Sequence, residues 1–195
     1  MSDRHHPKHE PTQPERLAGT ARQLLDFWRD AGPRHWFAKD EAFDATFRTR
    51  FHEAHFAAAR RELDAWLVQP DTSLALVLLL DQYPRNAFRG TGHMFATDGL
   101  ALHYSRQCLA RGYLALVEPE LRNFLCLPFM HAEDLATQEE SVVLYGQHLP
   151  DSLEWAVVHH DVIARFGRFP HRNPALGRDT TPEEARFLAD GGFSG

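Results

Sequence analysis

The sequence predicts an all-α protein built from one domain. Apolar residues recur at three- and four-residue steps along most of the 195 residues, whereas the alternation typical of strands is nearly absent. With 43% hydrophobic and 25% charged residues, the composition is that of a folded globular protein. We therefore expect a single helical domain over residues 17–195. Residues 1–16 should form a flexible tail, because this polar stretch offers no apolar surface to bury.

Two helical segments begin the predicted domain. The apolar residues from Leu17 to Trp28 align on one stripe of a helix that should end near Gly32. Residues 40–68 continue the pattern as one long helix or two abutting helices, closed by Pro70.

The run LALVLLL, residues 74–80, predicts the helix at the centre of the core. It is apolar on all sides, and leucine and alanine favour a helix over a strand. Asp71 or Ser73 is the expected cap. We place the polar cluster of residues 81–90 at the end of this helix.

Further helices follow, with glycine and proline as the expected boundaries. The predicted ranges are 96–111, 119–127 with a stop at Pro128, 133–148, and 153–166. Apolar residues cover most of the circumference of the helix 153–166, so we expect it to be buried on most sides, with His159 and His160 among apolar neighbours. The segment TTPEEARFL then begins a helix with a capping box of Thr181 and Glu184.

Charge and hydropathy exclude several functional classes. The formal net charge of -6 argues against wide nucleic-acid binding, which normally needs a basic face. The longest apolar run has seven residues, far short of a membrane span. Two cysteines are too few for a disulfide framework. We expect a cytoplasmic protein with no nucleic-acid or membrane partner, no cofactor and no metal.

The stretch RFGRFPHRNPALGR, residues 165–178, gathers four arginines and one histidine with no acid. Its glycines permit sharp turns, its prolines stiffen the loop, and its phenylalanines can anchor it. Guanidinium groups bind carboxylates and phosphates in a bidentate manner. Two interpretations follow: internal acids neutralise the loop as a structural clasp, or they only orient it and an anionic ligand completes the site. The internal acids are Asp81, Glu133, Asp134 and Asp161.

Three polar clusters at predicted helix ends, residues 81–90, 128–135 and 159–178, are expected to meet in a pocket that binds a small anionic ligand. His131 and His171 are the expected catalytic proton carriers. The expected ligand-binding residues are Asp81, Arg85, Asn86, Arg89, His160, Arg165, Arg168, Arg172, Asn173 and Arg178.

A second hypothesis is a helical scaffold that binds a protein partner in a groove, with the polar clusters as internal struts. Unpaired guanidiniums in a concave pocket would favour the ligand. Full pairing together with an exposed apolar groove would favour the scaffold. The sequence leaves open whether the protein is an enzyme.

Several long segments resemble the signature segments of one bacterial family, the domain of unknown function 924. They are LLLDQYPRNAFRG, FATDGLAL, LPFMHAEDL, RFGRFPHRN and LGRDTTPEEARFL, and the resemblance covers about residues 17–193. Ala132 and Thr180 stand where a serine is usual. The resemblance implies an all-helical fold of the tetratricopeptide-like superfamily, a right-handed array of antiparallel helices. It implies no particular activity.

Overall fold

The computed structural model describes residues 13–195, and every regular element among them is a helix, as predicted. The first twelve residues of the predicted tail lie outside the described residues. The α-helices are α1 Gln13–Ala31, α2 Pro33–Trp36, α3 Glu41–Ala59, α4 Pro70–Ala87, α5 Asp98–Ala110, α6 Arg122–Met130, α7 Leu135–His148, α8 Leu153–Phe166, α9 Asn173–Leu176 and α10 Pro182–Ala189. The short 3-10 helices are η1 Asp64–Val68, η2 Gly92–Phe95, η3 Tyr113–Ala115, η4 Pro119–Leu121, η5 Pro150–Ser152 and η6 Pro170–Arg172.

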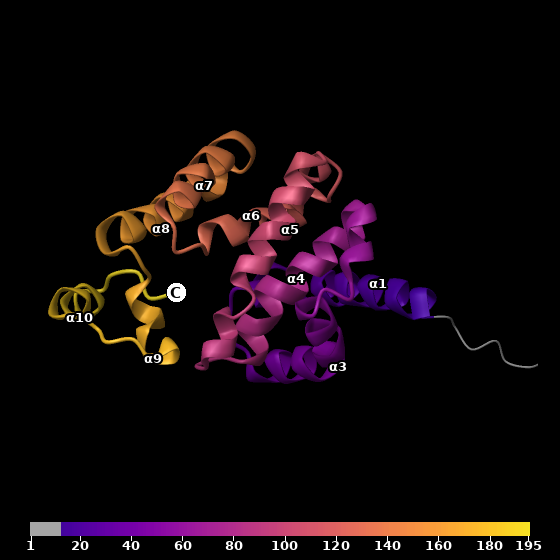
Figure 1. The fold of residues 1–195 in the computed structure, drawn as a ribbon, viewed down its shortest axis with the longest axis horizontal. Coiled ribbons are helices and arrows are strands. Elements are labelled where there is room, and N and C mark those ends of the chain that lie inside the picture. The colour runs from indigo at the N-terminus through magenta and orange to yellow at the C-terminus, as the bar shows by residue number, and fades with distance from the viewer. Residues whose placement is uncertain (1–12) are drawn as a thin grey trace, which may run out of the picture.

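Helix α4 forms the centre of the main core. Helices α1, α3, α5 and α6 pack against it, and Figure 1 shows it in the middle of this part of the molecule. The residues from Leu74 to Leu80 are at most 1% exposed. Burial on every side explains why this run has no polar face, and it confirms the prediction of a buried central helix.

The start of α4 differs from the prediction. The residue before the helix is Gln69, which makes no side-chain cap, and Pro70 begins the helix. Proline suits this position because its ring fixes a helical φ and its missing N–H has no partner to lose there. The predicted caps at Asp71 or Ser73 are therefore wrong, since both residues lie inside the first turn.

Helix α4 continues past Asp81 and stops at Ala87, inside the polar cluster 81–90 that was predicted at its end. Pro84 lies inside this extension and lacks the N–H that would bond to the Leu80 carbonyl. The hydroxyl of Thr97 donates to that carbonyl instead, at 2.5 Å. The polar residues that follow the apolar run thus belong to the same helix.

Other boundaries are confirmed in part. Residues 40–68 form two elements, α3 and η1, and Arg61 between them has a left-handed φ of 64° that interrupts the helix. The predicted stop at Pro128 is wrong, because α6 runs through it to Met130. Helix α1 begins at Gln13, before the predicted start at Leu17.

Helix α8 has its predicted bounds but is less buried than predicted. Its buried residues are Ala156, His159, Val162 and Ile163. Trp155 is 54% exposed, because α8 packs mainly against α7 and its opposite face stays open. His160, predicted among apolar neighbours, is partly exposed, and its Nδ1 lies 3.0 Å from Asp161 Oδ1.

The C-terminal segments build a second, smaller apolar cluster around Val162, Ile163 and Phe169. Helix α10 begins with the predicted capping box of Thr181 and Glu184, which is confirmed. Figure 1 shows α9 and α10 on the side of the molecule opposite α1. The candidate site lies between this cluster and the main core.

Candidate functional site

A cavity of about 490 Å³, here called the basic cavity, lies where α4, α6, α8, η2 and η6 meet. The polar residues that line it are Gln82, Arg85, Asn86, Arg89, Asn123, His131, Ser152, His159, His171 and Arg172. The apolar residues that line it are Trp36, Phe37, Met94, Phe95, Leu127, Met130, Trp155 and Phe193, and Gly195 completes the wall. The three predicted polar clusters therefore each contribute to one cavity.

Arg172 is the most buried cation of the basic cavity. Its Nη1 donates to Asp98 Oδ2 at 3.2 Å, and its Nη2 donates to the His131 carbonyl at 3.0 Å. The guanidinium also lies over the rings of Phe95 and Phe169, 4.5 and 4.4 Å from their centroids. Among the described residues, nothing accepts a hydrogen bond from its buried Nε. A bound anion would satisfy such a donor.

The positive charge of Arg172 is poorly stabilised by the protein. Burial lowers the pKa of its guanidinium to about 10. Asp98 opposes this shift, but the neighbouring Arg85 adds to it. A lowered pKa means that the protein stabilises the charged guanidinium less well than water does.

Asp98, the first residue of α5, joins two of the three arginines that line the cavity, Arg85 and Arg172. Its two oxygens accept from Arg85 Nη1 and Nη2, at 2.7 and 3.0 Å, in a bidentate pair. The Oδ2 atom also accepts from Arg172. Because one carboxylate holds both guanidiniums, their positions relative to each other are fixed.

Asp81 lies buried behind the cavity wall and orients His131. Its Oδ1 accepts from His131 Nδ1 at 2.7 Å, and its Oδ2 accepts from Gln82 Nε2 at 2.7 Å. Burial alone would raise the pKa of this carboxyl, but the charge of Arg85 and the hydrogen bond from His131 hold it well below its usual range. Since the carboxylate accepts, Nδ1 of His131 carries the hydrogen.

His131 is therefore a neutral ring with a free acceptor nitrogen. Burial, followed by the charge of Arg85, lowers the pKa of its imidazole. With Nδ1–H donated to Asp81, the lone pair lies on Nε2. His131 lines the basic cavity, so this arrangement has the form of a general base oriented by a carboxylate.

Two further histidines line the cavity as neutral rings. Burial lowers the pKa of His159 to about 3 and that of His171 to about 4. His159 Nδ1 donates to the Trp155 carbonyl at 2.7 Å, and its ring lies 4.3 Å from the ring of Phe193. The buried Nδ1 of His171 has no partner among the described residues. These rings add polarity to the wall without adding charge at neutral pH.

Three arginines of the stretch 165–178 do not line the cavity. They pair with acids: Arg165 with Glu183 at 3.0 Å, Arg168 with Glu184 at 2.7 Å, and Arg178 with Glu133 at 2.6 Å. Of the internal acids named from the sequence, only Glu133 pairs with an arginine of this stretch. Of the four arginines in this stretch, these three fit the interpretation as a structural clasp, and Arg172 alone lines the cavity.

The remaining predicted residues divide between the cavity and its surroundings. Asn86 and Arg89 line the cavity, and both bond to Asp44, at 2.8 and 2.5 Å. His160 does not line it. Asn173 does not line it either, and its side chain donates to Glu184 at 3.3 Å.

Sequence reasoning missed two important parts of the site. Asp98 was not predicted, because an acid in the first turn of a helix is ordinarily explained by the helix dipole. The aromatic wall of Trp36, Phe37 and Phe95 was also missed. These residues come from short segments between the long helices, where no periodicity identifies a buried face.

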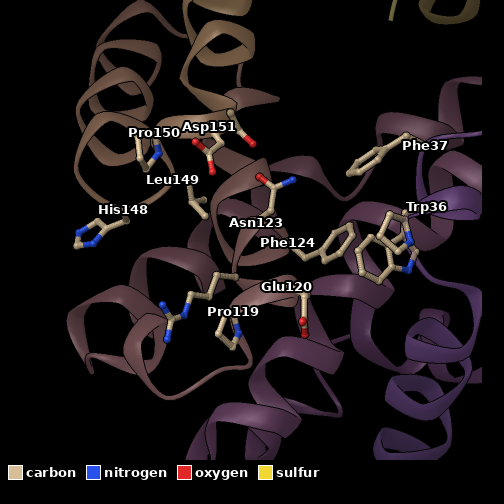
Figure 2. Close-up of a pocket in the computed structure, with 13 residues that line it drawn as sticks. Trp36, Phe37, Pro119, Glu120, Asn123, Phe124, His148, Leu149, Pro150 and Asp151 are labelled. Atoms are coloured by element: carbon tan, nitrogen blue, oxygen red, sulfur yellow. The ribbon is translucent and has the colours of Figure 1, made fainter.

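A second cavity of about 380 Å³, here called the proline-lined cavity, adjoins the first. Pro33, Pro119 and Pro150 line it. Figure 2 shows Trp36, Phe37 and Phe124 on one side of it and the segment from His148 to Asp151 on the other, with Asn123 between them. The residues that line both cavities are Trp36, Phe37, Asn123 and Ser152.

Within residues 13–195, no group of three or more histidine, cysteine, aspartate or glutamate side chains is placed to hold a metal ion. No helix in the described part of the chain is long and apolar enough to cross a bilayer.

The fold and the site define an all-helical protein with a cavity that combines arginine, histidine and aromatic side chains. Residues 24–192 match the family described as "Bacterial protein of unknown function (DUF924)", and the chain belongs to this family. It is also similar to the solved structure of a protein of unknown function from Agrobacterium tumefaciens, with 52% sequence identity and a TM-score of 0.86. That match covers 89% of this chain and 99% of the other. A comparison with curated proteins finds no match.

Proposed function

We propose that the protein binds a small anionic ligand in the basic cavity, with Arg172 and Arg85 as the anion-binding side chains. The observation that carries this proposal is the buried Nε of Arg172, which lacks a partner among the described residues although the residue lines the cavity. The lowered pKa of the same guanidinium supports it, because an added negative charge would relieve an unfavourable environment.

His131 is the proposed proton carrier of this site. Its neutral ring, oriented by Asp81, presents Nε2 as an acceptor that can take a proton from a ligand or from a water bound beside it. His171 is the second candidate carrier, because it lines the same cavity and its Nδ1 has no partner within residues 13–195. An enzymatic role for the site rests on these two histidines.

Chemical denaturation with and without sodium formate tests the anion site, because a ligand that binds only the folded state raises the free energy of unfolding. The wild type should gain stability from formate. In Arg172→Gln the free energy of unfolding should fall by about 1–3 kcal/mol, because the His131 carbonyl loses its donor. This variant should also lose the specific response to formate.

Arg178→Gln is the matched control. Arg178 belongs to the same stretch but pairs with Glu133 and does not line the basic cavity. This variant should keep the formate response, and it also reports any general salt effect on stability. Equal responses in wild type and both variants would refute the anion site.

The alternative function, a scaffold for a protein partner, is favoured by one observation. Trp155 and Val158, three residues apart on α8, are 54% and 37% exposed, so they place apolar surface on the open face of this helix. If this face binds a partner, Val158→Asp should leave the formate response unchanged, because Val158 does not line the basic cavity, and should abolish capture of that partner. The scaffold also agrees with the three paired arginines of the clasp.

We infer that the helices form a tetratricopeptide-like array within one folding unit over residues 17–195. Consecutive helices from α3 to α8 pack against each other, which is the neighbour-to-neighbour pattern of such arrays. A single cooperative transition in the denaturation experiment would support one unit. Cell fractionation tests the cytoplasmic location proposed from the composition.

A further inference from the structure

We propose that the ligand of the basic cavity is a singly charged carboxylate attached to an aromatic or aliphatic body, an inference that rests on the proposed anion site. The proposal combines the volume of the cavity, its apolar wall and its balance of charge.

The volume is too large for an inorganic anion alone. At about 490 Å³ the basic cavity falls within the range of roughly 300–1,000 Å³ that is typical of sites for organic ligands. A formate or phosphate ion on Arg172 would leave most of this space to water. That water would lie against aromatic rings, which cannot hydrogen-bond it well.

The wall has the composition expected for an amphiphilic ligand. Ten polar side chains, Arg85, Arg172 and His131 among them, supply the polar part. Eight apolar or aromatic side chains and Gly195 supply the rest of the lining. Phe37 and Trp155 are 66% and 54% exposed, so a ligand body in contact with them would remove apolar surface from water.

The adjoining cavity gives such a body room to extend. Trp36 and Phe37 line both cavities, and Figure 2 shows them beside Phe124 at the edge of the proline-lined cavity. The ring of Phe124 packs edge-on against Trp36, with 5.1 Å between the ring centroids. The shared wall is therefore an aromatic surface that suits a flat or flexible apolar group.

The carboxylates around the two arginines limit how much negative charge a ligand can bring. Arg85 and Arg172 are already accompanied by Asp98, and Asp81 lies close behind Arg85, 3.4 Å from its Nη1. A doubly charged phosphate would meet repulsion from both carboxylates. A planar carboxylate brings one charge and matches the planar guanidinium group.

Isothermal titration of the full chain tests this ligand class. The probes are acetate, hexanoate, phenylacetate, phenylacetamide and inorganic phosphate, each at up to millimolar concentration. Hexanoate or phenylacetate should bind at least tenfold more tightly than acetate and than phosphate. Phenylacetamide, which has the same body without the charge, should bind at least tenfold more weakly than phenylacetate.

Two variants with equally exposed side chains locate the apolar contact. Phe37→Ala should weaken phenylacetate binding at least threefold and leave acetate binding unchanged. Leu116→Ala is the control, because Leu116 is also 66% exposed but lines neither cavity. Since both side chains are largely exposed, both variants should fold, which circular dichroism checks.

The outcomes separate the two proposals. If acetate and phosphate bind, depend on Arg172 and are not surpassed by the larger carboxylates, the ligand class is refuted and the anion site stands. If phenylacetate and phenylacetamide bind equally well, or if no probe binds, both proposals are refuted. Loss of binding in Arg172→Gln should be checked with Arg172→Lys, which keeps the charge. If folded Arg172→Lys restores part of the affinity, the result supports the site. If it restores none, a direct role for this cation is refuted.

Discussion

Asp81 interacts with three neighbours at once. It accepts hydrogen bonds from His131 and Gln82 and lies near Arg85, and it follows directly on the buried apolar run of α4. A buried carboxylate in this position is stable only while its partners remain, because burial alone would raise the pKa of its carboxyl group. The orientation of His131 therefore depends on this residue.

Asp81→Asn should lower stability by roughly 1–3 kcal/mol, because one buried carboxylate oxygen becomes an amide nitrogen that cannot accept a hydrogen bond, whereas Arg85 keeps its pair with Asp98. It should also lower the pKa of His131 further, since Asp81 is one of the groups that raise it. Denaturation measures the first effect, and NMR titration of the His131 ring measures the second.

Asp161→Asn is the comparison for this variant. The Asp161 side chain is 70% exposed and contacts only the adjacent His160 among the described residues, so the change should cost no more than about 1 kcal/mol. Equal small losses in both variants would show that the carboxylate of Asp81 does not organise the site.

Helix α4 carries residues of the site and also contains a proline in its interior. Pro84 leaves the Leu80 carbonyl without its usual donor, and Thr97 fills the gap from another segment. The same segment leads directly into Asp98, which holds Arg85 and Arg172. Thr97 thus links the backbone of α4 to the position of α5.

Thr97→Val should cost about 1–3 kcal/mol, because the buried Leu80 carbonyl loses its hydrogen bond. Pro84→Ala restores an N–H that can bond to this carbonyl within the helix. The cost of Thr97→Val should therefore shrink in the Pro84→Ala background, which a double-mutant cycle of unfolding free energies measures. Strictly additive effects would contradict the account of α4.

Individual elements also show what local sequence can predict. The bounds of α8 and the capping box of α10 were predictable, because periodicity and capping act over a few residues. The continuation of α4 through Pro84 was not, because the Leu80 carbonyl is satisfied by a hydroxyl seventeen residues away in the chain. The exposure of α8 was likewise not predictable, since it depends on how many neighbours pack around the helix.

At the scale of the whole molecule, the basic stretch 165–178 is balanced by acids from distant segments. Arg178 bonds to Glu133, 45 residues away, and Arg172 bonds to Asp98, 74 residues away. The sequence predicted the meeting of the three polar clusters but not these pairs, because charge neutralisation depends on tertiary contacts. Which arginine faces the cavity therefore became clear only from the fold.

Stability should fall as the pH drops below about 6.5, because several histidines are buried as neutral rings. Burial lowers the pKa of His55 and His171 to about 4 and that of His159 to about 3, whereas in the unfolded chain each should titrate near 6.5. Below 6.5 the unfolded state binds protons that the folded state does not. Each such histidine lowers the free energy of unfolding by up to about 1.4 kcal/mol per pH unit until its folded pKa is reached.

His55 shows why these rings resist protonation. Its Nδ1 donates to the Leu79 carbonyl at 2.8 Å, so its Nε2 must accept the hydrogen bond from His93 Nε2, at 2.9 Å. A proton on His55 Nε2 would break this contact. Denaturation midpoints at about pH 7, 6 and 5 measure the effect, and a stability that stays constant or rises over this range would contradict it.

The proposed binding of an anion by the Nε–H donor of Arg172 is tested most directly by the NMR signal of this group during a titration with sodium formate. We expect this signal to shift and saturate. The Nε–H of Arg168, which donates to Glu184 at 2.7 Å outside the cavity, should stay in place. An Arg172 signal that does not move, or that moves only as much as that of Arg168, would contradict the account.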